Sequence, residues 1–82
     1  MPTYRITVVN REFTAHEERE LQDEAAAREE GIRGAIAIGA DQICDGEPMF
    51  GAEVTIDTVG GRRQRYVVTA GASRLNDEGA GP

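Results

Sequence analysis

The stretch EVTIDTVGGRRQRYVVTA, residues 53–70, decides the fold. Its two halves are rich in β-branched and aromatic residues, which favour strands. Gly60-Gly61 stands between the halves, and a glycine pair at that place is a strong signal for a tight turn. The stretch therefore predicts a β-hairpin, with one strand over Glu53–Val59 and its partner over Arg62–Ala70.

Two pairing registers are open to this hairpin, and the pattern of apolar residues decides between them. A two-residue loop at Gly60-Gly61 would place Ile56 opposite Arg65 and mix apolar with charged residues on each face. A three-residue loop that begins at Val59 avoids this mixture and is the predicted register, with Gly61 in the left-handed conformation. Its inner pairs are Ile56–Gln64, Val54–Tyr66 and Ala52–Val68, and its outer face pairs Asp57 with Arg63.

The N-terminal segment Thr3–Val9 also reads as a strand, because apolar and polar residues alternate along it. Only the four residues Glu12–Ala15 are available for a returning second strand before the polar stretch His16–Glu20. The polar stretch is interpreted as a connection. The pattern leaves open whether the second strand forms.

A helix is expected next, since Asp23 is a good N-cap and the residues from Glu24 onward favour helix. It should end between Ala37 and Gln42. A helical wheel gathers one apolar face for the core, made of Ala25, Ile32, Ile36, Gly39 and Ile43. A second stripe, whose small residues would let another backbone approach, holds Ala27, Gly31, Gly34 and Ile38.

These segments predict an α+β fold of order β(β)αββ, a small antiparallel sheet of three to four strands with one helix packed on one face. One domain should span residues 1–75, and the polar, turn-forming residues 76–82 predict a disordered tail. The inward positions of the strands and the helix give the expected core: Tyr4, Ile6, Val8, Ile32, Ile36, Val54, Ile56, Tyr66 and Val68.

The composition limits what such a domain does. Its 82 residues carry 15 acidic and 9 basic side chains, a formal net charge of −6, and only 39% are hydrophobic, so the core is thin. No apolar run is long enough to span a membrane, and the first residues lack a signal-peptide pattern, so a cytoplasmic protein is expected. One cysteine and one histidine cannot make a disulfide or a structural zinc site. We therefore expect no cofactor, no metal and no enzymatic activity.

Short motifs along the chain resemble those of a known family. The start Met1-Pro2-Thr3-Tyr4 and the segment Glu20-Leu21-Gln22-Asp23, which leads into Ala26-Ala27-Arg28, resemble a family of short, uncharacterised bacterial proteins. Its members begin Met-Pro-x-Tyr, carry Glu-Leu-x-x before an Ala-Ala-rich helix, and have a C-terminal β-hairpin. The resemblance covers most of residues 1–75 and implies the ββαββ order, but no activity. By fold analogy alone, the order is also similar to small antitoxin-like domains.

Three groups of residues invite a chemical interpretation. The imidazole of His16 lies beside two glutamates, as in a general base, but no nucleophile is near it, so a solvated loop residue is expected. The thiol of Cys44 lies beside Asp45 near a helix C-terminus, which disfavours the thiolate. A calcium loop is not expected, because its required spacing of oxygens is not met by the acidic residues Asp41, Asp45 and Glu47.

Charge clusters suggest two kinds of partner. Arg62, Arg63 and Arg65 lie beside Tyr66 on the hairpin, where they could contact nucleic acid, although the acidic protein as a whole would repel a polyanion. Acidic residues crowd the first 30 positions, which suits either a basic protein partner or a solubilising surface.

Self-association is expected of so small a core. The candidate surface comprises Gly31, Gly34 and Ile38 on the helix and Val67 on the hairpin. Whether helices or strand edges would meet in the homodimer stays open. The sequence thus predicts a small non-enzymatic interaction or regulatory module that self-associates, with a nucleic-acid-associated module as the alternative.

Overall fold

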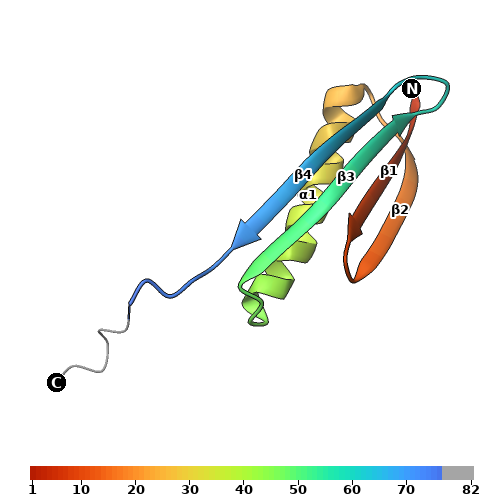
Figure 1. Ribbon diagram of the computed structural model, residues 1–82. Coiled ribbons are helices and arrows are strands. Elements are labelled where there is room, and N and C mark those ends of the chain that lie inside the picture. Colours follow the sequence, from red (N-terminus) through yellow and green to blue (C-terminus); the bar gives the residue numbers. More distant parts are fainter. Residues whose placement is uncertain (77–82) are drawn as a thin grey trace.

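Four antiparallel strands form one sheet, and a single helix lies across one face of it (Figure 1). The structure, a computed structural model, describes residues 1–76, so the tail predicted for 76–82 falls almost entirely outside the described residues. The elements run β1 Thr3–Asn10, β2 Phe13–Glu20, α1 Glu24–Cys44, β3 Met49–Thr58 and β4 Arg63–Gly71. The strand order is β2-β1-β3-β4, and the predicted α+β fold of order ββαββ is confirmed.

The predicted hairpin register is confirmed. Strand β3 pairs with β4 so that Ile56 lies opposite Gln64 and Asp57 opposite Arg63. The left-handed residue is Gly60, with a φ of +76°, so the prediction for Gly61 was wrong. The Gly61 amide donates to the Thr58 carbonyl oxygen at 2.8 Å, which closes a four-residue turn, and the positive φ at its third residue, Gly60, is that of a type II turn.

Strand β2 is twice as long as the segment proposed for it. The stretch His16–Glu20, predicted as a connection, belongs to the strand, which pairs with β1 as far as Thr3 opposite Glu20. This strand lies at an edge of the sheet, and the helix covers β1, β3 and β4 but not β2 within the described chain. With both faces open to solvent, β2 needs no alternation of apolar and polar residues, so its sequence carries no strand pattern.

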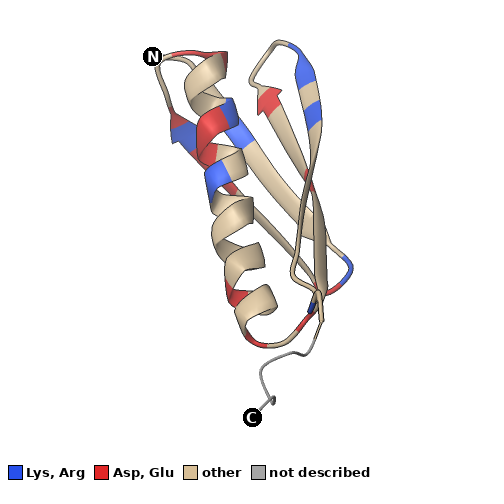
Figure 2. Cartoon of the chain, turned by 90° about the vertical axis from the view of Figure 1, so that its left-hand side faces the viewer, with Lys and Arg blue, Asp and Glu red and all other residues tan. Residues whose placement is uncertain are grey.

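Helix α1 begins where it was predicted to begin. The Asp23 carboxylate accepts a hydrogen bond from the Ala26 amide at 2.9 Å, which is the N-cap interaction. The helix continues to Cys44, beyond the predicted end between Ala37 and Gln42. Figure 2 shows helix and sheet as two layers, with the charged residues of α1 gathered mostly toward its N-terminal half.

The helix faces the sheet with its small residues. Of the predicted helical core face, Gly39 is buried and Ile32 and Ile43 pack against the core, whereas the prediction for Ile36 was wrong. The buried helical positions are Ala27, Gly31, Ala35 and Gly39. Ile36 is 51% exposed, and Ile32 is only half-buried. The sheet supplies the bulk of the core, through Tyr4, Ile6, Val8, Phe50, Val54, Ile56 and Val68, while Tyr66 is half-buried.

Close approach of the helix to the sheet explains this choice of residues. A Cβ atom on Gly31 would lie 2.8 Å from Cγ1 of Val54, and one on Gly39 would lie 2.6 Å from the ring of Phe50. Large isoleucine side chains cannot fit between the two layers at that distance, so they lie along the flanks of α1.

Candidate interaction surfaces

Strand β4 presents an open edge. Within the described residues the only strand beside it is β3, and Figure 1 shows its other side facing away from the rest of the sheet. The Thr58 amide donates a hydrogen bond to the backbone carbonyl oxygen of Arg62, and the Ala72 amide donates one to the carbonyl oxygen of Pro48. Hydrogen bonding alternates along an antiparallel pair, so the even-numbered residues of β4 bond to β3. The backbone groups of the odd-numbered residues 63–71 therefore point outward, and we call this row the β4 edge.

Apolar side chains border the β4 edge on both faces of the sheet. On the face without the helix, Val67 is 73% exposed. On the helix face, the guanidinium of Arg28 stacks over the ring of Tyr66, with 5.3 Å to the ring centroid. Ile32 and Ile36 follow Arg28 at intervals of four residues, and the three side chains line one shallow depression on that flank of α1. A monomer thus exposes Ile36 on one face of the sheet and Val67 on the other, beside the open β4 edge.

The opposite edge, β2, is charged instead of apolar. Its exposed residues include Glu17, Glu18 and Glu20, and no ion pair within residues 1–76 involves them. Charged side chains on an edge strand discourage pairing with a second chain. The β4 edge is therefore bordered by apolar side chains, whereas the β2 edge carries charged ones.

A small groove separates β2 from the helix. Its volume is about 180 Å³, and an ion pair between Arg19 and Glu30 joins the strand to α1 beside it. Apolar and small residues line most of the groove: Ile6, Val8, Ala15, Gly31, Gly34 and Ile38.

The four residues predicted for self-association do not form one surface. Gly31 is buried against β3, and its assignment to an exposed stripe was wrong. Gly34 and Ile38 line the groove beside β2, whereas Val67 lies at the β4 edge on the other face of the sheet. Only Val67 belongs to the more apolar of the two edges. Sequence reasoning missed Ile36, because its size marked it as a core residue.

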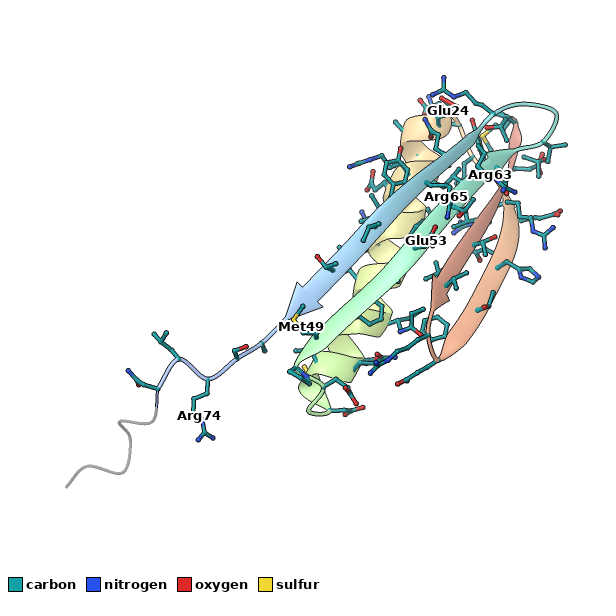
Figure 3. All side chains as sticks on the ribbon, in the orientation of Figure 1. Glu24, Met49, Glu53, Arg63, Arg65 and Arg74 are labelled. Carbon is teal, nitrogen blue, oxygen red and sulfur yellow. The ribbon has the colours of Figure 1, made fainter. Side chains whose placement is uncertain are left out.

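The three arginines considered for nucleic-acid contact each lie beside a carboxylate. The Arg63 guanidinium donates to Asp57 at 2.6 Å and 3.3 Å, and this carboxylate raises the pKa of Arg63 through the hydrogen bond and its charge. Arg65 pairs with Glu53, and Arg62 lies 3.4 Å from Glu24. Figure 3 shows Glu24 and Arg63 near one end of the molecule, with Arg65 and then Glu53 progressively nearer the middle of the sheet. The basic cluster is thus locally neutralised.

The remaining polar candidates lie apart from one another. His16 is exposed on β2 opposite Thr7, and Cys44 is exposed at the last residue of α1. Within residues 1–76, no group of three or more histidine, cysteine or acidic residues could hold a metal ion. In the same part of the chain, no helix has the length and apolar character needed to cross a membrane.

Comparison with protein-family models, with curated proteins and with solved structures gave no match to this chain. The resemblance to short bacterial proteins therefore stays a prediction.

Proposed function

We propose that this protein is a small, non-enzymatic interaction module of the cytoplasm that works as a homodimer. The observation that carries the proposal is the pair of exposed apolar side chains, Val67 and Ile36, which lie on opposite faces of the sheet beside the open β4 edge. A domain whose fully buried helical residues are all alanines and glycines has little apolar burial to spare. Covering Val67 and Ile36 with a second copy would add burial that the monomer lacks.

A reducing compartment suits the single cysteine. Cys44 is exposed and unbridged, and such a thiol persists in the cytoplasm but is prone to oxidation outside the cell. This supports the cytoplasmic part of the proposal.

Sedimentation equilibrium over nanomolar to micromolar protein concentrations tests self-association. We expect a concentration-dependent mass that reaches twice 8.9 kDa. A single 8.9 kDa species throughout this range would contradict the proposal.

The nucleic-acid alternative is separated from the proposal by a titration with RNA and with duplex DNA at two salt concentrations. Binding that weakens steeply with added salt would favour the alternative. We expect no such binding, because Arg62, Arg63 and Arg65 are each close to a carboxylate and the whole chain carries a formal charge of −6.

A further inference from the structure

We infer that two copies of this chain pair edge to edge along β4, antiparallel to one another, about a two-fold axis that passes at Val67. The inference rests on the self-association proposed above and specifies its geometry. The two four-stranded sheets would become one continuous sheet with β4 and its copy at the centre.

The backbone of β4 is prepared for such pairing. Residues 65, 67, 69 and 71 turn their N–H and C=O groups away from β3, and no described strand satisfies these groups. An antiparallel copy places the same odd-numbered row opposite this row, so every outward donor near the axis meets an outward acceptor. The segment Tyr66–Gly71 carries no charge, so nothing in it resists this approach.

The side chains favour the register centred on Val67 over one centred on Arg65. In that register the two Val67 side chains lie directly opposite each other, and each Arg65 lies opposite Thr69 of the copy. A register centred on Arg65 would instead oppose two guanidinium groups, which is unfavourable. Centring on Val67 therefore buries the most exposed apolar side chain of the strand and keeps like charges apart.

The helix face supports the same arrangement. The flank of α1 that carries Ile36 lies on the side of β4, as the stacking of Arg28 over Tyr66 shows. Edge pairing brings this flank toward the same flank of the copy. One contact thus covers Val67 on one face of the sheet and Ile36 on the other.

Strand β2 is the competing edge, and its charges argue against it. Pairing β2 with its own copy about Glu17 or Glu18 would place two carboxylates opposite each other. The second copy therefore belongs on β4.

Cysteine cross-linking tests the register directly. In a Cys44→Ser background, Val67→Cys places two thiols on residues whose Cα atoms are about 5.5 Å apart, within the disulfide range of roughly 4.4–6.8 Å. We expect mild oxidation to convert most of this variant to a covalent dimer. Val67 is exposed, so its replacement leaves the fold intact.

Three further cysteine variants in the same background test the register. Thr69→Cys alone should not cross-link, because the two copies of residue 69 are four residues out of register, about 13 Å apart. A mixture of Thr69→Cys and Arg65→Cys should link as a heterodimer. Val59→Cys, which is exposed but remote from the axis, reports random collision. Equal cross-linking of Val59→Cys and Val67→Cys would overturn the inference.

Sedimentation of the same proteins separates the two levels of the proposal. A dimer whose Val67→Cys variant does not cross-link would retain self-association and remove the β4 geometry. A dimer that Gly34→Leu abolishes would move the contact to the helix beside β2 and also remove this geometry. A monomer at all concentrations would remove both proposals.

Discussion

The glycines of helix α1 fall into two groups, those that contact the sheet and one that does not. Gly39 and Gly31 face the sheet, where an added methyl group would collide with Phe50 or with Val54. Gly34 is exposed, and apart from its chain neighbours and the adjoining turns of helix backbone no described atom lies within 4 Å of the place where its Cβ would stand. The first two glycines therefore set the distance between the layers, whereas the third only weakens the helix.

Alanine substitutions should distinguish a glycine that contacts the sheet from one that does not. Gly34→Ala should stabilise the protein by about 0.5–1 kcal/mol, because alanine favours helix and meets no neighbour. Gly39→Ala should destabilise it by about 1–3 kcal/mol, since the rigid, buried ring of Phe50 must shift. Urea denaturation of the two variants checks both signs. Equal stability of the two would contradict the close contact between α1 and β3.

Tyr4 links stability to alkaline pH. Its pKa is raised above the ordinary value of 10.0 by burial first, and then by the charges of Glu24 and Asp23. The folded protein thus holds the phenolic proton more tightly than the unfolded chain does. The resulting stability is present below about pH 10 and is lost as the pH rises through the folded pKa.

The variant Tyr4→Phe has no phenolic proton to lose. Above about pH 10, the free energy of unfolding should therefore fall more steeply for the natural protein than for Tyr4→Phe. Urea denaturation at a series of alkaline pH values measures the difference between the two slopes. Parallel slopes would show that Tyr4 titrates alike in the folded and unfolded chains.

At the scale of the element, helix α1 packs with its small residues inward and its isoleucines on the flanks. The helical wheel of apolar residues placed Gly39 correctly on the core face, but it also placed Ile36 there and put Ala27 and Gly31 on a separate stripe. The face of the helix that packs on the sheet is decided by how closely the sheet side chains approach the helix backbone, above all Phe50 and Val54. This distance between helix and sheet depends on tertiary packing, so the sequence of the helix alone does not reveal it.

The two isoleucines Ile36 and Ile56 should respond differently to truncation. In dilute solution, Ile56→Ala should cost about 2–5 kcal/mol of unfolding free energy, because Ile56 is fully buried. Ile36→Ala should cost less than about 1 kcal/mol there, since the side chain is half exposed. The same Ile36→Ala variant should weaken self-association, as measured by sedimentation. A large loss of stability in the dilute monomer would instead show that Ile36 contributes to the core.

The strands differ in how well their sequences predict them. Strands β3 and β4 bury one face, so a shift of one residue would expose the core, and the register could be predicted from the pattern alone. Strand β2 buries neither face over most of its length, and it is held mainly by its backbone pairing with β1 and by the ion pair of Arg19 with Glu30. The residues beside the β4 edge also differ in how well the sequence predicts them. Val67 was recognisable as an outward apolar residue, and Ile36 was not.

At the scale of the whole molecule, charge opposes the association of two copies. Each chain carries a formal charge of −6, whereas the contact proposed at β4 would be mainly apolar. Added salt screens the repulsion and leaves apolar contacts in place. Raising the ionic strength from about 10 to about 150 mM shortens the screening length from roughly 30 to roughly 8 Å.

We therefore expect the dissociation constant of the dimer to fall several-fold over this range of salt. Sedimentation at the two salt concentrations measures it. A dissociation constant that rises with salt would instead indicate that ion pairs hold the dimer together.

The acidic strand β2 has a consequence for how far assembly can go. A sheet with two receptive edges adds copies without limit and grows into a fibre. A dimer joined at β4 would end on β2 at both sides, where the carboxylates of Glu18 and Glu20 meet any third molecule. Growth would then terminate at two chains, so the edge that joins the copies would not seed a polymer.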